Sequence, residues 1–299
     1  MNDEIDLKEY LKFIKSKIYR ILLFSFIICL TGSLYKGYVG NFYVSTSLII
    51  PQKDNNSSDF IDSNLGNLAS LARINIPSET DKSDVALEIL KSKKFIDNFL
   101  IKRGILKDIF ALNSWNKESN TLVYDLELLD KDSIRLIDSF KISNEKAHDE
   151  WLDNIFNFQR DSKTGFIRLN ITHRSPHRAE EILDWLITDL NNEMRDIDVN
   201  EAELSLNFLY NGVSEITNIR IKEIYYRLIE SYTEKKMLAF SRQDYVFKVI
   251  DPPAVSEKPI GLSFWILFFT LFFTGFGIIF FFYSAIFYIF DNKNFKDID

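Results

Sequence analysis

Residues 260–290 form an apolar run that contains no charged side chain. An α-helix rises about 1.5 Å per residue, so roughly 20 apolar residues span the hydrocarbon core of a bilayer. The run is long enough to cross a bilayer with room for tilt or for an interfacial end. It therefore predicts a transmembrane helix, and the alternative is a helix buried in the core of a soluble domain.

A second apolar run covers residues 21–40. Arg20 and Lys36 lie near its ends, and both side chains are long enough to reach the headgroup region. A buried core helix and a cleaved signal peptide are the two alternatives. The exit at 31–36 shows no clear small-x-small cleavage site, and the polar-rich segment 1–20 precedes the run, which favours an uncleaved anchor.

Basic side chains beside the two runs set the expected orientation, because cytoplasmic flanks carry an excess of lysine and arginine. These side chains are Lys8, Lys12, Lys15, Lys17 and Arg20 before the first run, and Lys293 and Lys296 after the second. The expected organisation is a cytoplasmic segment at 1–20, a span at 21–40, an extracytoplasmic domain at 41–259, a span at 260–290 and a cytoplasmic tail at 291–299.

Strand and helix signals alternate in the extracytoplasmic domain. The β-branched and aromatic runs 42–50 and 245–250 predict a first and a last strand, and each borders one of the apolar runs. We therefore expect these two strands to pair in one membrane-proximal sheet. Between them the sequence predicts a loop at 52–63, a helix capped by Asp84 that ends at Gly104, and a hairpin with strands 156–160 and 166–172.

A long helix is predicted to begin after that hairpin. Ser175 is a good N-cap, and Pro176 sits at the first helical position, where its missing N–H costs nothing. No proline interrupts the pattern before Pro252. The predicted fold class is therefore α+β: two transmembrane helices flank a domain with a membrane-proximal α/β base and a long helical, coiled-coil-like extension.

Apolar residues recur along this helix at intervals of 3, 4 and 3, at Leu206, Leu209, Val213 and Ile216. This spacing indicates a helix that packs along its length against a partner helix, either in the same subunit or in a neighbour. The alternative is an ordinary amphipathic helix of a bundle.

Small residues in the two spans predict how these helices meet. Close approach of small side chains drives helix association in lipid, where apolar surface gives little drive. Thr270, Thr274 and Gly277, with Ser284, share one face of the second span. Ser25, Cys29 and Gly32 share a face of the first. We expect the two stripes to pack together, with chance spacing as the alternative.

The sequence carries little sign of catalysis. A net charge of −7 argues against a nucleic-acid partner, and there is no P-loop, GxGxxG or GxSxG motif. His173 and His177 have a spacing that can hold zinc on a helix, but Pro176 places His173 before the helix. We therefore expect two solvated loop histidines, and no catalytic residue, metal site or cofactor.

Several short motifs follow one another along the chain. They are the acidic-apolar start 3–7, the small-residue segment 65–72, the helix motif 89–100, and the junction from Thr164 to Ser175, Pro176 and Ala179. The most specific runs from Met237 through the strand 245–250 to Asp251, Pro252 and Pro259. In this order between two spans they resemble the bacterial polysaccharide co-polymerases, the chain-length determinant or Wzz-type proteins. That family usually has Asp where this chain has Ser175, which can cap equally well.

The resemblance implies a non-catalytic inner-membrane protein that forms ring-like homo-oligomers, with its long helices rising from the bilayer. It implies a role in setting the chain length of a surface polysaccharide, usually O-antigen of lipopolysaccharide. The implied partners are the lipid bilayer, a separate polymerase and the growing lipid-linked glycan. A capsule-export co-polymerase and a membrane-anchored periplasmic sensor are the alternatives, and the short tail 291–299 counts against the sensor.

Overall fold

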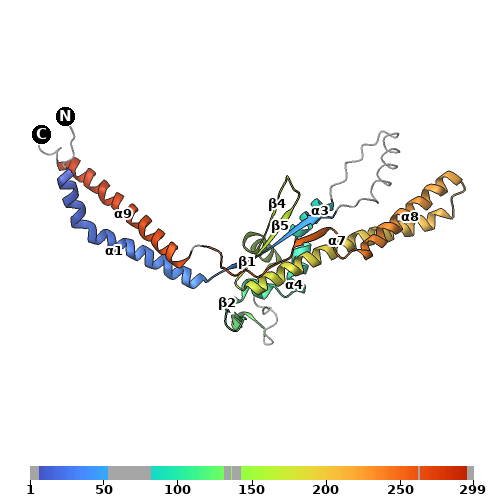
Figure 1. Ribbon diagram of the computed structural model, residues 1–299, viewed down its shortest axis with the longest axis horizontal. Helices are drawn as coiled ribbons and strands as arrows, with labels where there is room; N and C mark the ends of the chain where they lie inside the picture. The colour runs from blue at the N-terminus through green and yellow to red at the C-terminus, as the bar shows by residue number, and fades with distance from the viewer. Residues whose placement is uncertain (1–6, 53–81, 131–135, 137–142, 262, 295–299) are drawn as a thin grey trace. The chain divides into compact units, whose positions relative to one another are not determined.

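The computed structural model describes residues 7–52, 82–130, 136, 143–261 and 263–294. The predicted loop at 52–63 falls almost wholly outside these residues, as does the small-residue segment 65–72. The chain divides into two compact units, one made of Met1–Asn41 with Ile260–Asp299 and the other of Phe42–Pro259 (Figure 1). Each unit is described by itself.

The first unit is an antiparallel pair of long helices, α1 (Leu7–Val39) and α9 (Phe264–Asn294). Within them, Tyr10–Gly37 and Phe264–Ile289 are long and apolar enough to cross a bilayer. Both predicted spans therefore fall on continuous helices. The first helix begins well before residue 21, because its basic segment continues the helical pattern of the apolar run.

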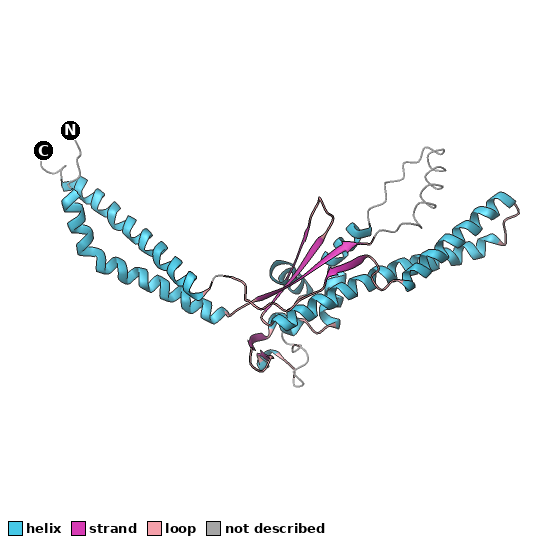
Figure 2. Cartoon of the chain, in the orientation of Figure 1, coloured by secondary structure: helices cyan, strands magenta, loops and turns pink. Residues whose placement is uncertain are grey.

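A four-stranded antiparallel sheet in the order β4-β5-β1-β6 organises the second unit (Figure 2). Its strands are β1 (Tyr43–Pro51), β4 (Phe156–Arg160), β5 (Ile167–His173) and β6 (Phe247–Asp251). The predicted pairing of the first and last strands is confirmed, with Ile49 opposite Val249. The predicted hairpin is also confirmed, with Phe158 opposite Leu169.

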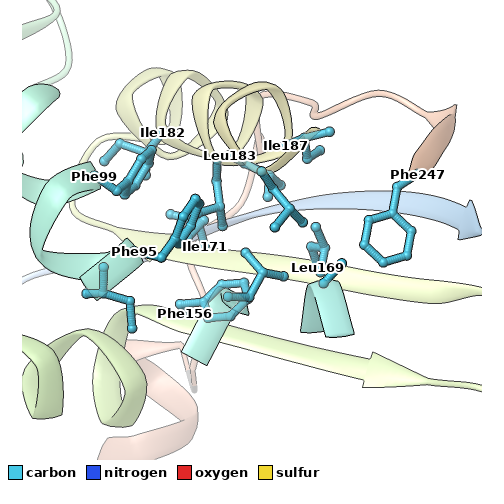
Figure 3. Close-up of a cluster of buried hydrophobic side chains, with 14 of the residues drawn as sticks. Phe95, Phe99, Phe156, Leu169, Ile171, Ile182, Leu183, Ile187 and Phe247 are labelled. Atoms are coloured by element: carbon cyan, nitrogen blue, oxygen red, sulfur yellow. The ribbon is translucent and has the colours of Figure 1, made fainter. Parts of the chain in front are cut away.

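One face of the sheet carries the hydrophobic core. Alternate residues of β5, namely Ile167, Leu169 and Ile171, are fully buried, as the period of a strand requires. The first half of α7 (Pro176–Val213) lies across this face and contributes Ile182, Leu183 and Ile187 (Figure 3). Aromatic side chains complete the core, and these are Phe95, Phe99, Trp151, Phe156, Tyr245 and Phe247.

The predicted helix from Asp84 to Gly104 is two helices, α3 (Lys82–Lys91) and α4 (Lys93–Lys102). Ser92 breaks it, because its backbone is extended and its hydroxyl accepts a hydrogen bond from the Phe95 N–H at 3.3 Å. Asp84 therefore lies in the first turn of α3 and is not its cap. Gly104 ends α4 as expected, with a φ of +64°.

Short elements that the sequence analysis did not predict fill the segment between α4 and β4. They are α5 (Leu106–Phe110), β2 (Leu112–Asn116), β3 (Thr121–Tyr124), the 3₁₀ turn η1 (Leu126–Leu128), α6 (Asn144–Glu150) and the π-helical turn η2 (Trp151–Ile155). Strands β2 and β3 pair in a small separate hairpin.

The long helical extension folds back on itself. Helix α7 ends at Val213, and α8 (Ile219–Ser241) begins after Asn218, whose side-chain oxygen accepts from the Arg220 N–H at 3.0 Å. The partner helix is therefore α8 of the same chain. Leu209 is buried in this seam and Val213 is half-buried at its end. The placement of Ile216 on the seam was wrong, because the chain reverses at 214–218.

We expect Leu169→Ala to lower the free energy of unfolding by about 3 kcal/mol, because it leaves a cavity in the core that the sheet and α7 share. Urea unfolding of the detergent-solubilised protein measures the change. Ile250→Ala, at a β6 position that is 48% exposed, is the matched control and should cost less than about 1 kcal/mol. Equal losses for the two variants would mean that the core face has been assigned wrongly.

Candidate functional site

Asn191 of α7 binds the chain where it returns from the helical hairpin to the sheet. Its side-chain oxygen accepts hydrogen bonds from the backbone N–H groups of Tyr245, Val246 and Phe247, at 3.2, 2.9 and 3.0 Å. Its amide nitrogen donates to the Phe247 carbonyl at 3.2 Å. One buried carboxamide therefore provides hydrogen-bond partners for the backbone groups at the start of β6.

Arg195, one turn further along α7, holds the end of α8. Its Nε donates to the Ala239 carbonyl at 2.9 Å, and its Nη2 donates to the carbonyls of Arg242 and Gln243 at 2.9 and 3.0 Å. These carbonyls close a helix terminus, where backbone acceptors lack partners within the helix. The guanidinium group therefore acts as a cap supplied by a neighbouring helix.

Asp198 completes the set. The Tyr245 hydroxyl donates to its carboxylate at 2.5 Å, and the ammonium groups of Lys82 and Lys235 lie at 3.2 and 3.3 Å. Burial raises the pKa of Asp198, but the Tyr245 hydrogen bond and the two lysines together outweigh it, so the pKa lies below its usual value. The carboxylate therefore stays ionised while it binds the Tyr245 hydroxyl and the two lysines.

We call Asn191, Arg195 and Asp198 the α7 clamp. Their spacing of four and three residues places them on one face of α7, and they bind the segment 239–247. The sequence analysis missed them. The sequence does indicate one of them, since Asn191 is a polar residue between Leu190 and Met194 on the buried stripe of the helix.

The motif that follows the clamp acts through its backbone. The side chains of Asp251, Pro252 and Pro259 are exposed. The Asp251 carbonyl accepts from the Ser47 hydroxyl at 2.7 Å, and the Ala254 carbonyl accepts from the Ser45 hydroxyl at 3.0 Å. Two buried serines of β1 therefore hold the segment that leads toward α9.

A second polar cluster fixes the start of α7. Ser175 is the N-cap, as predicted, and accepts from the Arg178 N–H at 3.3 Å. The Arg178 Nε donates to Asp108 at 2.7 Å, and its guanidinium lies 4.8 Å from the Trp185 ring. Tyr124 donates to Asp108 at 2.6 Å, and its pKa is raised by burial and by this hydrogen bond.

His173 corrects an expectation. It is the last residue of β5 and is buried, whereas a solvated loop position was expected. Its Nδ1 accepts from the Ser175 N–H at 3.0 Å, which makes it part of the strand-to-helix junction. Burial lowers the pKa of His173. His177 is exposed, as expected.

The seam between α1 and α9 uses the predicted face of the first span. Ser25 and Cys29 are fully buried, and they donate to the carbonyls of Phe272 and Phe268 at 3.1 and 3.2 Å. Gly32 lies where the Leu271 side chain packs, since a Cβ there would stand 2.3 Å from the Leu271 Cδ1. Larger side chains of α9 therefore pack against small residues of α1.

The predicted face of the second span was wrong for three of its four residues, because of these four Ser284 alone meets α1, with its hydroxyl 3.2 Å from the Tyr10 hydroxyl. Thr270, Thr274 and Gly277 are exposed on α9. The two threonine hydroxyls donate to carbonyls one turn earlier in α9, at 2.7 and 2.8 Å. Gly275 lies in the seam instead, where an added Cβ would meet Ile28 and Ser25 at 3.5 and 3.6 Å. The large side chains of α9 enter the seam because the small residues of α1 leave room for them.

The helical hairpin presents apolar side chains to its surroundings. They include Ile197, Leu204 and Phe208 on α7 and Ile219, Tyr226 and Met237 on α8, with exposures from 44% to 82%, and Tyr210, Ile221, Ile224 and Phe240 are exposed elsewhere on the hairpin. The spacing of seven and four in the first set, and of seven and eleven in the second, gives one face to each set. Clustered exposed apolar residues of this kind mark interaction surfaces.

No protein-family model and no curated protein matches the chain. Among solved structures, a fragment of WzzB, a polysaccharide co-polymerase from Salmonella Typhimurium, is similar over 74% of this chain and 100% of that one, with 11% sequence identity and a TM-score of 0.32. A full-length bacterial polysaccharide co-polymerase is similar over 99% of each chain, with 10% identity and a TM-score of 0.33.

We expect Asn191→Ala to destabilise the protein by about 3 kcal/mol or more, because three buried backbone N–H groups lose their acceptor. Thermal unfolding in detergent, followed by circular dichroism, measures this. Asn207→Ala, at an exposed position of the same helix, should change stability by less than about 0.5 kcal/mol. A mild effect at Asn191 would show that the clamp contributes little to closing the domain.

We expect Gly275→Leu to separate α1 from α9, because a bulky side chain would press on Ser25 and Ile28. Gly277→Leu should be silent, since nothing in the described residues lies within 4 Å of its added Cβ. Disulfide trapping of Cys29 with cysteines introduced at 268 and, as a control, at 270 reports the distance between the helices. Efficient trapping at 270 would contradict the assigned seam.

Proposed function

We propose that this chain is a non-catalytic regulator of the chain length of a surface polysaccharide of O-antigen type, acting in the bacterial inner membrane beside a separate polymerase. One observation carries the proposal. The segment from Met237 to Pro259, which bears the most specific motif of the co-polymerase family, is the segment that the α7 clamp holds and that pairs with β1. The motif therefore lies where the last strand joins the sheet and completes the domain.

The proposed topology places both ends of the chain in the cytoplasm and Phe42–Pro259 in the periplasm. The basic flank before residue 21 and the two candidate spans support it. Tyr43 begins β1 four residues after α1 ends, so the sheet is the part of the domain tied to the first span. The helical hairpin is separated from both spans by strands of that sheet.

The proposed assembly is a homo-oligomer that forms through the helical hairpin. The exposed apolar faces of α7 and α8 support this, because a solvated hairpin gains nothing from Phe208 or Ile219 at 69% and 82% exposure. Contact with a second copy would remove these side chains from water. A regulator that sets the length of a polymer made by another protein then works as a scaffold.

The decisive test is the glycan profile of a deletion strain. We expect a shifted distribution of lipopolysaccharide chain lengths on gels, restored by the wild-type gene. Loss of a surface capsule with unchanged lipopolysaccharide would instead favour a capsule-export co-polymerase. Unchanged glycans with altered transcription would favour a membrane-anchored sensor.

We expect Phe208→Asp to abolish the oligomer without unfolding the subunit, because the side chain is exposed in the single chain and would be buried only by the proposed contact with a second copy. Leu209→Asp should remove folded protein, since Leu209 is 5% exposed and its carboxylate would lack a partner. Asn207→Asp, at an exposed polar position beside both, is the control. Chemical crosslinking and size-exclusion chromatography in detergent measure the assembly. Oligomers of native size from Phe208→Asp would place the contact elsewhere.

A further inference from the structure

An open groove of about 750 Å³ lies between α7 and the chain that runs from the end of α8 into β6. One wall is a row of exposed α7 side chains at intervals of four residues, namely Asp184, Thr188, Asn192 and Asp196. The opposite wall includes Phe240, Gln243 and Asp244. The volume falls within the range of small-ligand sites, roughly 300–1,000 Å³.

Two of the three α7 clamp residues line this groove. Asn191 and Arg195 both line it, and both hold the opposite wall in place through the hydrogen bonds described above. Arg195 also donates to the Asn192 side chain at 2.7 Å. The two walls are therefore joined by buried or half-buried polar contacts, so the groove is a fixed feature of the domain.

The lining matches the chemistry of a sugar. Carboxylates, amides and a hydroxyl group accept and donate hydrogen bonds at short intervals, as the hydroxyl groups of a pyranose require. The ring of Phe240 is 67% exposed, and an aromatic face attracts the C–H edge of a pyranose ring. A polar rim beside an apolar surface is the pattern of a site that binds an amphipathic ring.

The charge of the groove selects among glycans. Three carboxylates line it, from Asp184, Asp196 and Asp244, and they outnumber the guanidinium groups of Arg195 and Arg242. Four N–H donors of Arg195 are already used within the protein. A carboxylate-bearing or phosphate-bearing ligand would meet like charge there. Neutral sugars and amino sugars would not, and an ammonium group would gain from the carboxylates.

We propose that this groove binds a stretch of neutral or amino-sugar oligosaccharide, the growing glycan itself. The proposal rests on the proposed function and adds to it a direct contact between the regulator and the polymer whose length it sets. Clamp side chains then have two roles, since they hold the chain that enters β6 and also line the binding surface.

The test uses the full-length protein in detergent, with surface polysaccharide purified from the strain that carries this chain and released from lipid by mild acid. We expect the double variant Asp184→Asn with Asp196→Asn, and separately Phe240→Ala, to weaken binding at least tenfold. Asp153→Asn and Leu126→Ala are controls at exposed positions outside the groove and outside the helical hairpin, and should bind as the wild type does. Oligogalacturonate, an acidic glycan, should not compete.

Three results would overturn the groove assignment. These are wild-type binding by the groove variants, no binding by the wild-type protein, and effective competition by oligogalacturonate. Complementation of the deletion strain separates this failure from failure of the proposed function. If deletion leaves glycan lengths unchanged, the proposed function is wrong. If deletion shifts them and the groove variants restore the wild-type profile with normal oligomers, only the groove is wrong.

Discussion

The carboxamide of Asn191 is the contact on which the rest of the domain depends. It accepts from three consecutive backbone N–H groups at the point where the chain leaves the helical hairpin. Those groups enter the domain interior and have no water to bind, so each would otherwise be a buried donor without a partner. With them satisfied, Phe247 can enter the core and β6 can pair with β1.

Local sequence rules predicted the features that depend on a few neighbouring residues. Ser175 and Pro176 marked the start of α7, and β-branched runs marked β1 and β6, because capping and strand alternation are short-range effects. The break at Ser92 and the reversal at 214–218 were not predicted, since each competes with a helical pattern that continues on both sides. At both points a new N-cap, from Ser92 and from Asn218, prevails over the continuing helical pattern.

The seam between α1 and α9 shows why the spacing of small residues alone was insufficient to predict which faces of the two helices meet. Each stripe of small residues lies on one face of its own helix, yet Thr270, Thr274 and Gly277 of the second stripe do not lie in the seam, whereas Ser25, Cys29 and Gly32 of the first do. Their positions leave room that Leu271 and Phe272 fill, so a second small stripe there would leave a void. The clamp residues were missed for a different reason. Their hydrogen-bond partners in segment 239–247 lie 44 to 56 residues away along the chain, which no local pattern records.

The pairing of β1 with β6 has a consequence for membrane insertion. The strand that follows α1 and the strand that precedes α9 are neighbours, and Ser45 and Ser47 hold the segment after β6 along β1. In the folded sheet, the segment that enters β1 and the segment that leaves β6 therefore lie side by side. Association of α1 with α9 then proceeds at the high effective concentration of a short tether, and much of the entropy of bringing two helices together in lipid is lost when the sheet folds. Hydrogen bonds from Ser25 and Cys29, one between Tyr10 and Ser284, and the close packing of small residues can then be sufficient to hold the seam, because the folded sheet already tethers the two helices.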